Sequence, residues 1–266
     1  MKVLFLGDIF GNPGRTVISR ELPKLIKKHG ADLVIANGEN AAGGIGINPG
    51  IADFLLDAGI DVITSGNHIY KKKEIYDYIN AQPRLIKPAN FPPDTPGNGY
   101  YIFYNPKFLE KKVAVVNVCG RVFVENLDCP FRKMDELLSE IYSQTNIVIV
   151  DFHAEVTSEK IAMGWYLDGR VSAVIGTHTH VQTADERILP KGTAFISDAG
   201  MVGPRDSVIG VKKELIIERF VKMMPQKFVV ANDDIWVNGV VLDIDQSSGR
   251  TKSITRINYG ADTDRF

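Results

Sequence analysis

Short runs of apolar residues recur along the whole chain, and most of them contain no polar position. Unbroken runs of this kind are typical of strands that helices bury on both faces, whereas half-exposed strands alternate apolar and polar residues. We predict strands over these ranges: Val3–Leu6, Leu33–Ala36, Val62–Thr64, Val113–Val118, Ile147–Val150, Val171–Ile175, Ala194–Ile196 and Val240–Ile244.

Other segments carry apolar residues at helical spacing. The predicted helices are Arg15–His29, Pro49–Ala58, Lys72–Ala81, Lys133–Gln144 and Thr157–Leu167. Pro23 lies inside the first helix and is expected to kink or interrupt it, because proline removes a helical hydrogen bond. The alternation of strands and helices predicts an α/β protein with parallel strands, which we expect to form one domain over residues 1–266.

Turn-forming residues mark two further features. The stretch from Pro88 to Tyr100 is rich in proline and glycine, which predicts a loop at the seam between two halves of the sheet. Beyond Val240 the chain alternates as a hairpin does, with Asp245 to Gly249 as its turn.

Composition adds little to this picture but excludes several classes of protein. Hydrophobic residues make up 44% and charged residues 24% of the 266 residues, which is ordinary for a globular protein. The net charge of -1 gives no overall attraction to long nucleic acids or to membranes, and the short lysine runs are solvated faces.

The cysteines and the start of the chain bear on location. Cys119 and Cys129 are the two cysteines, and neither belongs to a paired metal or redox motif. The apolar run before Gly7 has four residues, and no later run approaches the roughly 18 residues of a membrane span. We expect a cytoplasmic protein that is neither exported nor inserted in a membrane.

Residues suited to metal binding follow five of the predicted strands. The carboxyl ends of parallel strands converge on one edge of a sheet, so these groups are expected to meet. Four of the five histidines lie in them, and His29 is the exception. The groups are Gly7-Asp8, Asn37-Gly38-Glu39-Asn40, Ser65-Gly66-Asn67-His68, Asp151-Phe152-His153 and Gly176-Thr177-His178-Thr179-His180.

Each group alone is more typical of a helix cap, a turn or a core histidine, but their joint occurrence favours a metal site. Carboxylate, amide and imidazole ligands suit iron, manganese or zinc-like ions. Two such ions about 3.5 to 4 Å apart can clamp a phosphoryl group and activate water, with Glu39 as a bridge. In an extended segment His178 and His180 would point the same way, so each could reach one ion.

This ordered set resembles the calcineurin-like metallophosphoesterases, whose motifs run GD, GD-N, GNH, H and GH-x-H. More narrowly, the stretches GDIFGNPGR, NGENAAGG and GTHTHVQTAD resemble the bacterial YmdB-type branch, which is described as phosphodiesterases of cyclic nucleotides. The resemblance spans about Lys2 to Gly210. It implies an α/β fold with central mixed β-sheets flanked by helices, and a metal site at the carboxyl ends of the strands.

The resemblance also implies roles for single residues. Two divalent or trivalent ions, iron and/or manganese, would be held, and a metal-bound hydroxide would attack a small cyclic nucleotide such as 2',3'-cyclic AMP. His68 would be the general acid. One ion would be bound by Asp8, Glu39, Asn40 and His180, and the other by Glu39, Asn67, His153 and His178.

The chain departs from the wider family in three places. The first motif is usually D-x-H, but Phe10 stands at the histidine position, so Asn40 is expected to substitute as a ligand. Glu39 occupies a position where aspartate is commoner. Ile69 follows His68 where an acidic residue is often found, so the sequence does not identify the group that orients His68.

Substrate contacts and the alternatives to an enzyme are less defined. Arg15 follows a Pro-Gly stretch at a helix start, which can attract phosphate, and Arg205 and Ser207 lie in a loop after a strand, although plain turns explain both stretches more simply. A phosphomonoesterase or nuclease could use the same centre, and a regulatory or RNA-associated protein could retain it. The near-neutral charge disfavours a nuclease that grips long polyanions, and a homo-oligomer is left open.

Overall fold

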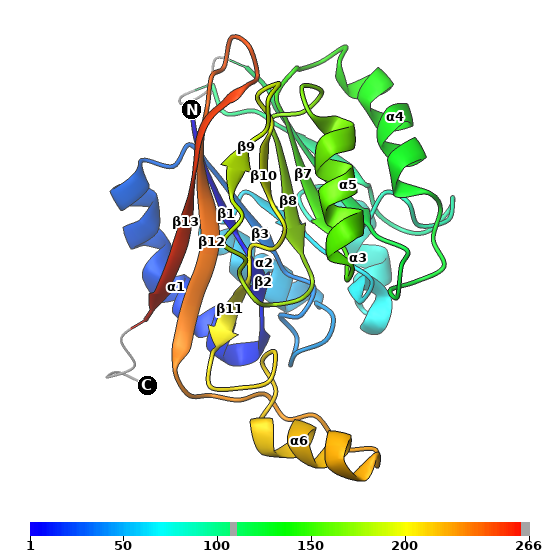
Figure 1. Ribbon diagram of the computed structural model, residues 1–266, viewed down its shortest axis with the longest axis vertical. Coiled ribbons are helices and arrows are strands. Elements are labelled where there is room, and N and C mark those ends of the chain that lie inside the picture. Colours follow the sequence, from blue (N-terminus) through cyan, green and yellow to red (C-terminus); the bar gives the residue numbers. More distant parts are fainter. Residues whose placement is uncertain (107–110, 262–266) are drawn as a thin grey trace.

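All eight predicted strands form, and they divide between two β-sheets in the computed structural model, which describes residues 1–106 and 111–261 (Figure 1). The first sheet has the order β2-β11-β12-β1-β3-β4, with β13 paired to β12. Its strands are β1 (Lys2–Leu6), β2 (Asp8–Ile9), β3 (Leu33–Asn37), β4 (Val62–Thr64), β11 (Met201–Pro204), β12 (Ile235–Ile244) and β13 (Thr251–Gly260).

The second sheet has the order β5-β6-β7-β8-β10-β9. In the first sheet, β1, β3 and β4 are parallel neighbours, and β12 pairs antiparallel with β1. In the second sheet, β6, β7, β8 and β10 are parallel, while β5 pairs antiparallel with β6 and β9 with β10. The expected mixed sheets are therefore confirmed. The strands of the second sheet are β5 (Tyr100–Phe103), β6 (Val113–Cys119), β7 (Val148–His153), β8 (Ala173–Thr177), β9 (Arg187–Ile188) and β10 (Ala194–Ile196).

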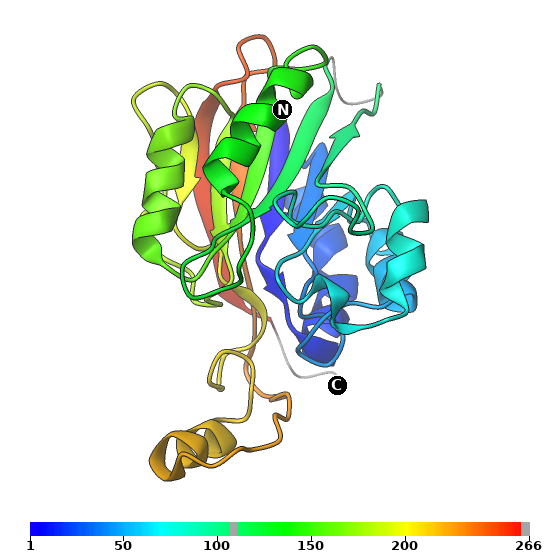
Figure 2. The ribbon, with the colours of Figure 1, turned by 90° about the vertical axis from the view of Figure 1, so that its right-hand side faces the viewer.

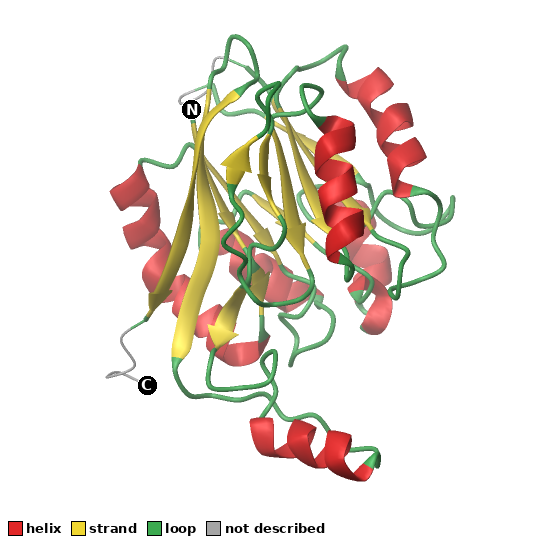
Figure 3. Ribbon diagram, in the orientation of Figure 1, coloured by secondary structure: helices red, strands yellow, loops and turns green. Residues whose placement is uncertain are grey.

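The two sheets pack against each other, and helices cover the outer face of each (Figure 3). Along β1, Val3 and Phe5 belong to the core between the sheets, whereas Leu4 and Leu6 face the helices, because successive side chains point to opposite faces. The expectation that helices bury both faces is thus wrong for one face of each sheet. Each sheet buries that face of the other, which explains the unbroken apolar runs as well as a second layer of helices would.

The predicted helices are confirmed with shifted ends. Helices α1 (Gly11–His29), α2 (Pro49–Asp57) and α3 (Ile75–Ala81), with the 3-10 turn η1 (Ile69–Lys71), lie on the first sheet, and α4 (Pro130–Ile141) and α5 (Thr157–Leu167) lie on the second. Pro23 does not interrupt α1. The carbonyl that it leaves without a partner belongs to Ser19, which is exposed to water.

Two predicted connections are also confirmed, and one helix was not predicted. The loop before Tyr100 leads from α3, which lies on the first sheet, to β5 of the second sheet. Asp245 to Gly249 forms the turn of the β12–β13 hairpin, where Gly249 has a φ of 74°. Helix α6 (Lys213–Lys222) stands away from the two sheets (Figure 2).

Within the described ranges, no helix has the length and apolar character needed to cross a bilayer. A single domain over residues 1–266 stays a prediction, and residues 107–110 and 262–266 of that range lie outside the described part.

Candidate metal centre

Three strands of the first sheet deliver predicted ligands to one edge. Asp8 begins β2 directly after β1, Glu39 and Asn40 follow β3, and Asn67 follows β4. Because β1, β3 and β4 are adjacent and parallel, their carboxyl ends lie side by side.

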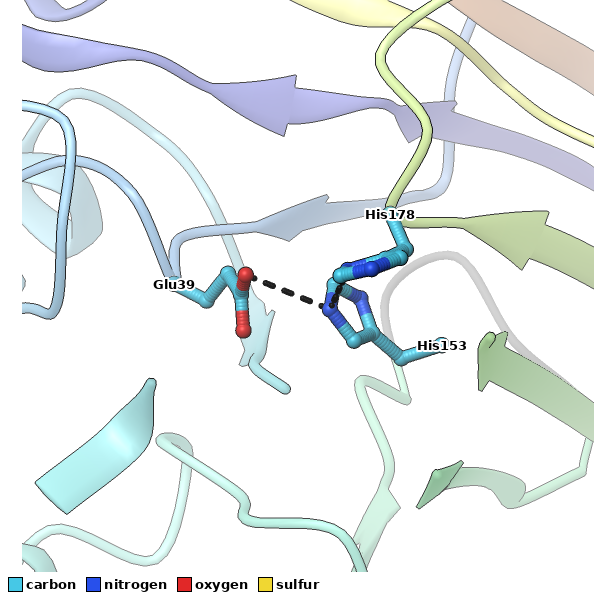
Figure 4. Close-up of side chains that lie close together, drawn as sticks. All are labelled: Glu39, His153 and His178. Carbon is cyan, nitrogen blue, oxygen red and sulfur yellow. Dashed lines mark hydrogen bonds and ion pairs between the residues drawn. The ribbon is translucent and has the colours of Figure 1, made fainter. Parts of the chain in front are cut away.

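The second sheet completes the group from its own parallel strands. His153 ends β7, and His178 and His180 follow the neighbouring strand β8. Glu39, His153 and His178 turn toward one another, and one ligand atom from each lies within 4.8 Å of the others (Figure 4). His153 Nε2 is 3.2 Å from Glu39 Oε1 and 2.9 Å from His178 Nδ1.

Two buried oxygens of this group have no hydrogen-bond partner in the structure, which describes residues 1–106 and 111–261. They are Asp8 Oδ1 and Asn67 Oδ1. Asp8 Oδ1 lies 3.8 Å from His180 Nε2, a separation that an ion bound to both atoms at about 2.1 Å would bridge. Buried polar atoms normally find partners, so both oxygens fit ligands of a cation.

Gly66 allows the ligands to approach one another. A Cβ atom at this position would lie 2.1 Å from Glu39 Oε2 and 2.3 Å from His153 Nε2. Any other residue would therefore displace two predicted ligands, which gives a physical reason for the glycine before Asn67.

The segment that carries the paired histidines is a turn, so the expectation of an extended segment is wrong. Strand β8 ends at Thr177, and His178 and His180 have φ values of 103° and 66°, in the left-handed region that such residues seldom adopt. Asp198 Oδ2 accepts hydrogen bonds from the backbone N and the Oγ1 of Thr179, at 3.1 and 2.7 Å. This carboxylate fixes the turn, which still directs one histidine to His153 and the other toward Asp8.

Asn40 and Glu39 are the groups that orient His68, which the sequence could not identify. Asn40 Oδ1 and Glu39 Oε1 each lie 3.1 Å from His68 Nδ1. The amide nitrogen of Asn40 is 3.0 Å from His180 Nε2. Asn40 can therefore serve as a ligand beside His180 only if a half-turn of its amide brings the oxygen to that side.

The pKa values of the cluster show how its charges interact. Burial raises the pKa of Asp8. Burial also acts to raise the pKa of Glu39, but the charges and hydrogen bonds of His153 and His68 outweigh it and hold that pKa well below its usual value. Burial opposes charge on His153, yet Glu39 raises its pKa to about 9, while burial and His153 lower the pKa of His178 to about 3. The buried carboxylate of Glu39 thus requires a positive partner, which a divalent ion fits.

A cavity of about 470 Å³ opens beside this cluster. Its polar lining comes from Glu39, Asn40, His68, His178 and His180. Its apolar lining comes from Phe10, Ile45, Ile209, Val211, Phe228 and Val230.

The three predicted substrate contacts lie outside that cavity. Arg15 donates hydrogen bonds to the carbonyl of Ala41 and to Asn12 Oδ1. Arg205 and Ser207 line a second cavity of about 270 Å³, which shares His180 and Ile209 with the first, and the Arg205 guanidinium stacks 3.9 Å from the centre of the Trp236 ring.

Sequence reasoning gave no role to several polar residues that contact the predicted ligands. Glu155 Oε2 lies 3.2 Å from His178 Nε2 at the rim of the cavity. Thr177 Oγ1 lies 2.9 Å from His153 Nδ1 and donates to Asp151 Oδ1 at 2.7 Å. A buried aspartate two residues before a predicted ligand, inside an apolar strand, was the available signal for this network.

Comparison with known proteins agrees with the geometry. The family model of the YmdB-like protein matches residues 4–257. The 2',3'-cyclic-nucleotide 2'-phosphodiesterase of Bacillus subtilis (strain 168) is 50% identical over 97% of this chain and 96% of its own length.

Two solved structures share the whole architecture. A hypothetical protein from Thermus thermophilus superposes with a TM-score of 0.91 at 40% identity, over 98% of this chain and 99% of the other. A structure described as a novel phosphatase from Mycoplasma pneumoniae gives 0.91 at 36% identity, over 98% and 93%. The expected calcineurin-like fold is confirmed, and the chain belongs to the YmdB-like family.

Proposed function

We propose that this chain is a metal-dependent phosphodiesterase that hydrolyses small cyclic nucleotides of the 2',3' type. The observation that carries the proposal is a buried cluster of carboxylate and imidazole ligands that opens onto a cavity with an apolar wall. The name of the relative from Bacillus subtilis supports this substrate class.

The proposed cofactor is a pair of divalent or trivalent ions, iron and/or manganese. When bound, such a pair neutralises charge on phosphoryl oxygens and lowers the pKa of a bound water. The partnerless oxygens of Asp8 and Asn67 and the closely spaced Glu39, His153 and His178 support this centre. One ion would be held by Asp8, Glu39, Asn40 and His180, and the other by Glu39, Asn67, His153 and His178.

His68 is the proposed general acid. Glu39 Oε1 lies 3.1 Å from its Nδ1, which fixes the ring and leaves Nε2 as the nitrogen that can give a proton to the leaving oxygen, also when the Asn40 amide has turned toward the ion. Its side chain is 26% exposed and lines the cavity, so a substrate can reach it.

The apolar wall gives the substrate its second point of attachment. Ligand sites combine an apolar surface with a few placed polar groups. With the phosphate at the ligand cluster, a nucleobase would lie against Phe10, Ile45 and Phe228. A substrate with one phosphate and one flat apolar group therefore matches a cavity that has both a ligand cluster and an apolar surface.

The test is the turnover of a panel of substrates by manganese-loaded protein: 2',3'-cyclic AMP, 3'-AMP and a short RNA. We expect the cyclic diester to react faster than 3'-AMP, because it carries one negative charge where the monoester carries about two near neutral pH, and faster than RNA, because its five-membered ring is strained. Faster hydrolysis of 3'-AMP would instead support a phosphomonoesterase, and faster cleavage of RNA a nuclease. Turnover of none would favour a regulatory role.

A further inference from the structure

We infer that Thr177 and Asp151 are positioning residues that turn the Nε2 lone pair of His153 toward the metal centre. The affinity of that centre for a divalent ion then depends on a threonine hydroxyl that binds no ion itself. The inference rests on the proposed metal-dependent function.

Thr177 stands between the imidazole and the carboxylate. Its Oγ1 lies 2.9 Å from His153 Nδ1 and 2.7 Å from Asp151 Oδ1, and all three residues are fully buried. No solvent molecule is needed to complete this chain of hydrogen bonds, so the orientation of each group depends on its neighbour.

The acceptors fix the direction of the protons. A carboxylate accepts only, and Asp151 also receives Thr64 Oγ1 at 2.5 Å and Asn37 Nδ2 at 3.0 Å. The single proton of the Thr177 hydroxyl is therefore donated to Asp151. Its lone pair faces His153 Nδ1, which must then carry the N–H.

The amide of Asn37 does not compete for this nitrogen. Asn37 Nδ2 lies 3.5 Å from His153 Nδ1, but its two hydrogens are donated to the carbonyl of Ser65 at 3.1 Å and to Asp151 at 3.0 Å. Thr177 is thus the partner that selects the tautomer of His153.

With its proton on Nδ1, the neutral ring presents a lone pair at Nε2. That atom lies 3.2 Å from Glu39 Oε1, and in the neutral ring both atoms present lone pairs, so a favourable contact needs either a metal ion between them or a second proton on the ring. Partners of this kind fix the orientation of metal-binding histidines, and their loss typically weakens metal binding about 10- to 100-fold.

The experiment measures Co²⁺ affinity by the visible absorption of the loaded protein. Thr177→Val removes the hydroxyl at nearly constant volume and is expected to weaken binding by about 10- to 100-fold, whereas Thr177→Ser should restore it. Thr193→Val is the matched control, because Thr193 is equally buried and its hydroxyl donates to the carbonyl of Val171, outside this network. It should leave Co²⁺ affinity close to that of the wild type.

A second readout does not depend on affinity. In Zn²⁺-loaded protein with ¹⁵N-labelled histidine, only five side chains contribute, and His153 should show a slowly exchanging Nδ1–H signal that shifts in Thr177→Val. If Thr177→Val does not fold, Asp151→Asn serves instead, because its amide can donate to Thr177 and push the His153 proton to Nε2. Unchanged affinity and an unchanged signal in the variant would overturn the inference and leave the proposed function standing. A wild type that binds no Co²⁺ would overturn both.

Discussion

The side chains at the candidate metal centre differ in whether their polar atoms have hydrogen-bond partners. Among the residues that the structure describes, Asp8 and Asn67 each keep a buried oxygen without a hydrogen-bond partner, whereas His68 is held at Nδ1 by Asn40 and Glu39. Partnerless groups suit ligands, and a ring held at one nitrogen suits proton transfer through the other. Hydrogen bonding therefore supports the proposed roles of Asp8 and Asn67 as ligands and of His68 as the acid.

The role of His68 leads to the first prediction. His68→Ala should keep the fold and the bound metal but lower kcat on 2',3'-cyclic AMP by about 10²- to 10⁴-fold, the usual value of general acid help. The loss should shrink for a p-nitrophenyl ester, because p-nitrophenolate leaves without a proton. Metal analysis and steady-state kinetics on both substrates check this. Loss of metal from the variant would make His68 a ligand, and full activity on both substrates would remove the acid role.

At the scale of the element, a buried ion pair fixes the turn that carries His178 and His180. Lys160 on α5 donates to Asp198 Oδ2 at 2.7 Å, and the two side chains are 3% and 1% exposed. Asp198 also holds Thr179 between the two histidines. Helix α5 thereby supports a turn whose backbone lies in an uncommon conformation.

The second prediction concerns this pair. Lys160→Met leaves the Asp198 carboxylate buried without its cation, so the free energy of unfolding should fall by about 3 to 5 kcal/mol. Lys222→Met is the control, because Lys222 pairs with Glu218 at 2.6 Å on the exposed face of α6, and such pairs contribute about 1 kcal/mol or less. Urea denaturation of both variants tests the difference. Equal losses would show that the buried pair is not a support of the turn.

Eight strands could be predicted from the sequence because each contains an apolar run, and the candidate ligands could be predicted because they follow such runs. The short strands β2, β5, β9 and β11 were not predicted. Helix α6 was missed although its apolar residues recur at helical spacing, and in the structure Ile216 is buried while Ile217 and Phe220 remain exposed. The contact between Asn40 and His68 spans 28 residues and exists only in the folded chain. Nothing in the sequence distinguishes Thr177 from other threonines in strands, so its contact with His153 could not be predicted.

At the scale of the whole molecule, the cavity joins segments that are distant in the sequence. Phe10 comes from the start of the chain, Ile45 from the loop after β3, and Ile209 and Phe228 from the segments on either side of α6. No periodicity in the sequence links these positions, so the cavity could not be predicted from it.

The third prediction follows from the apolar wall. Phe228→Ala should raise KM for 2',3'-cyclic AMP about fivefold or more, since stacking on an aromatic side chain contributes about 1 to 3 kcal/mol per base. KM for bis-p-nitrophenyl phosphate, which has no nucleobase, should change less. Phe220→Ala is the control, because Phe220 is 72% exposed on α6 and does not line the cavity. Similar KM changes in the two variants would place the base elsewhere.

The most direct test of the central claim is a metal titration of turnover. Protein stripped with a chelator is titrated with Mn²⁺ while hydrolysis of 2',3'-cyclic AMP is followed. We predict no activity in the stripped protein and a rise that ends at two equivalents, because the ligands around Glu39 divide into two sets. Activity without metal, or a rise that is complete at one equivalent, would contradict a dinuclear phosphodiesterase.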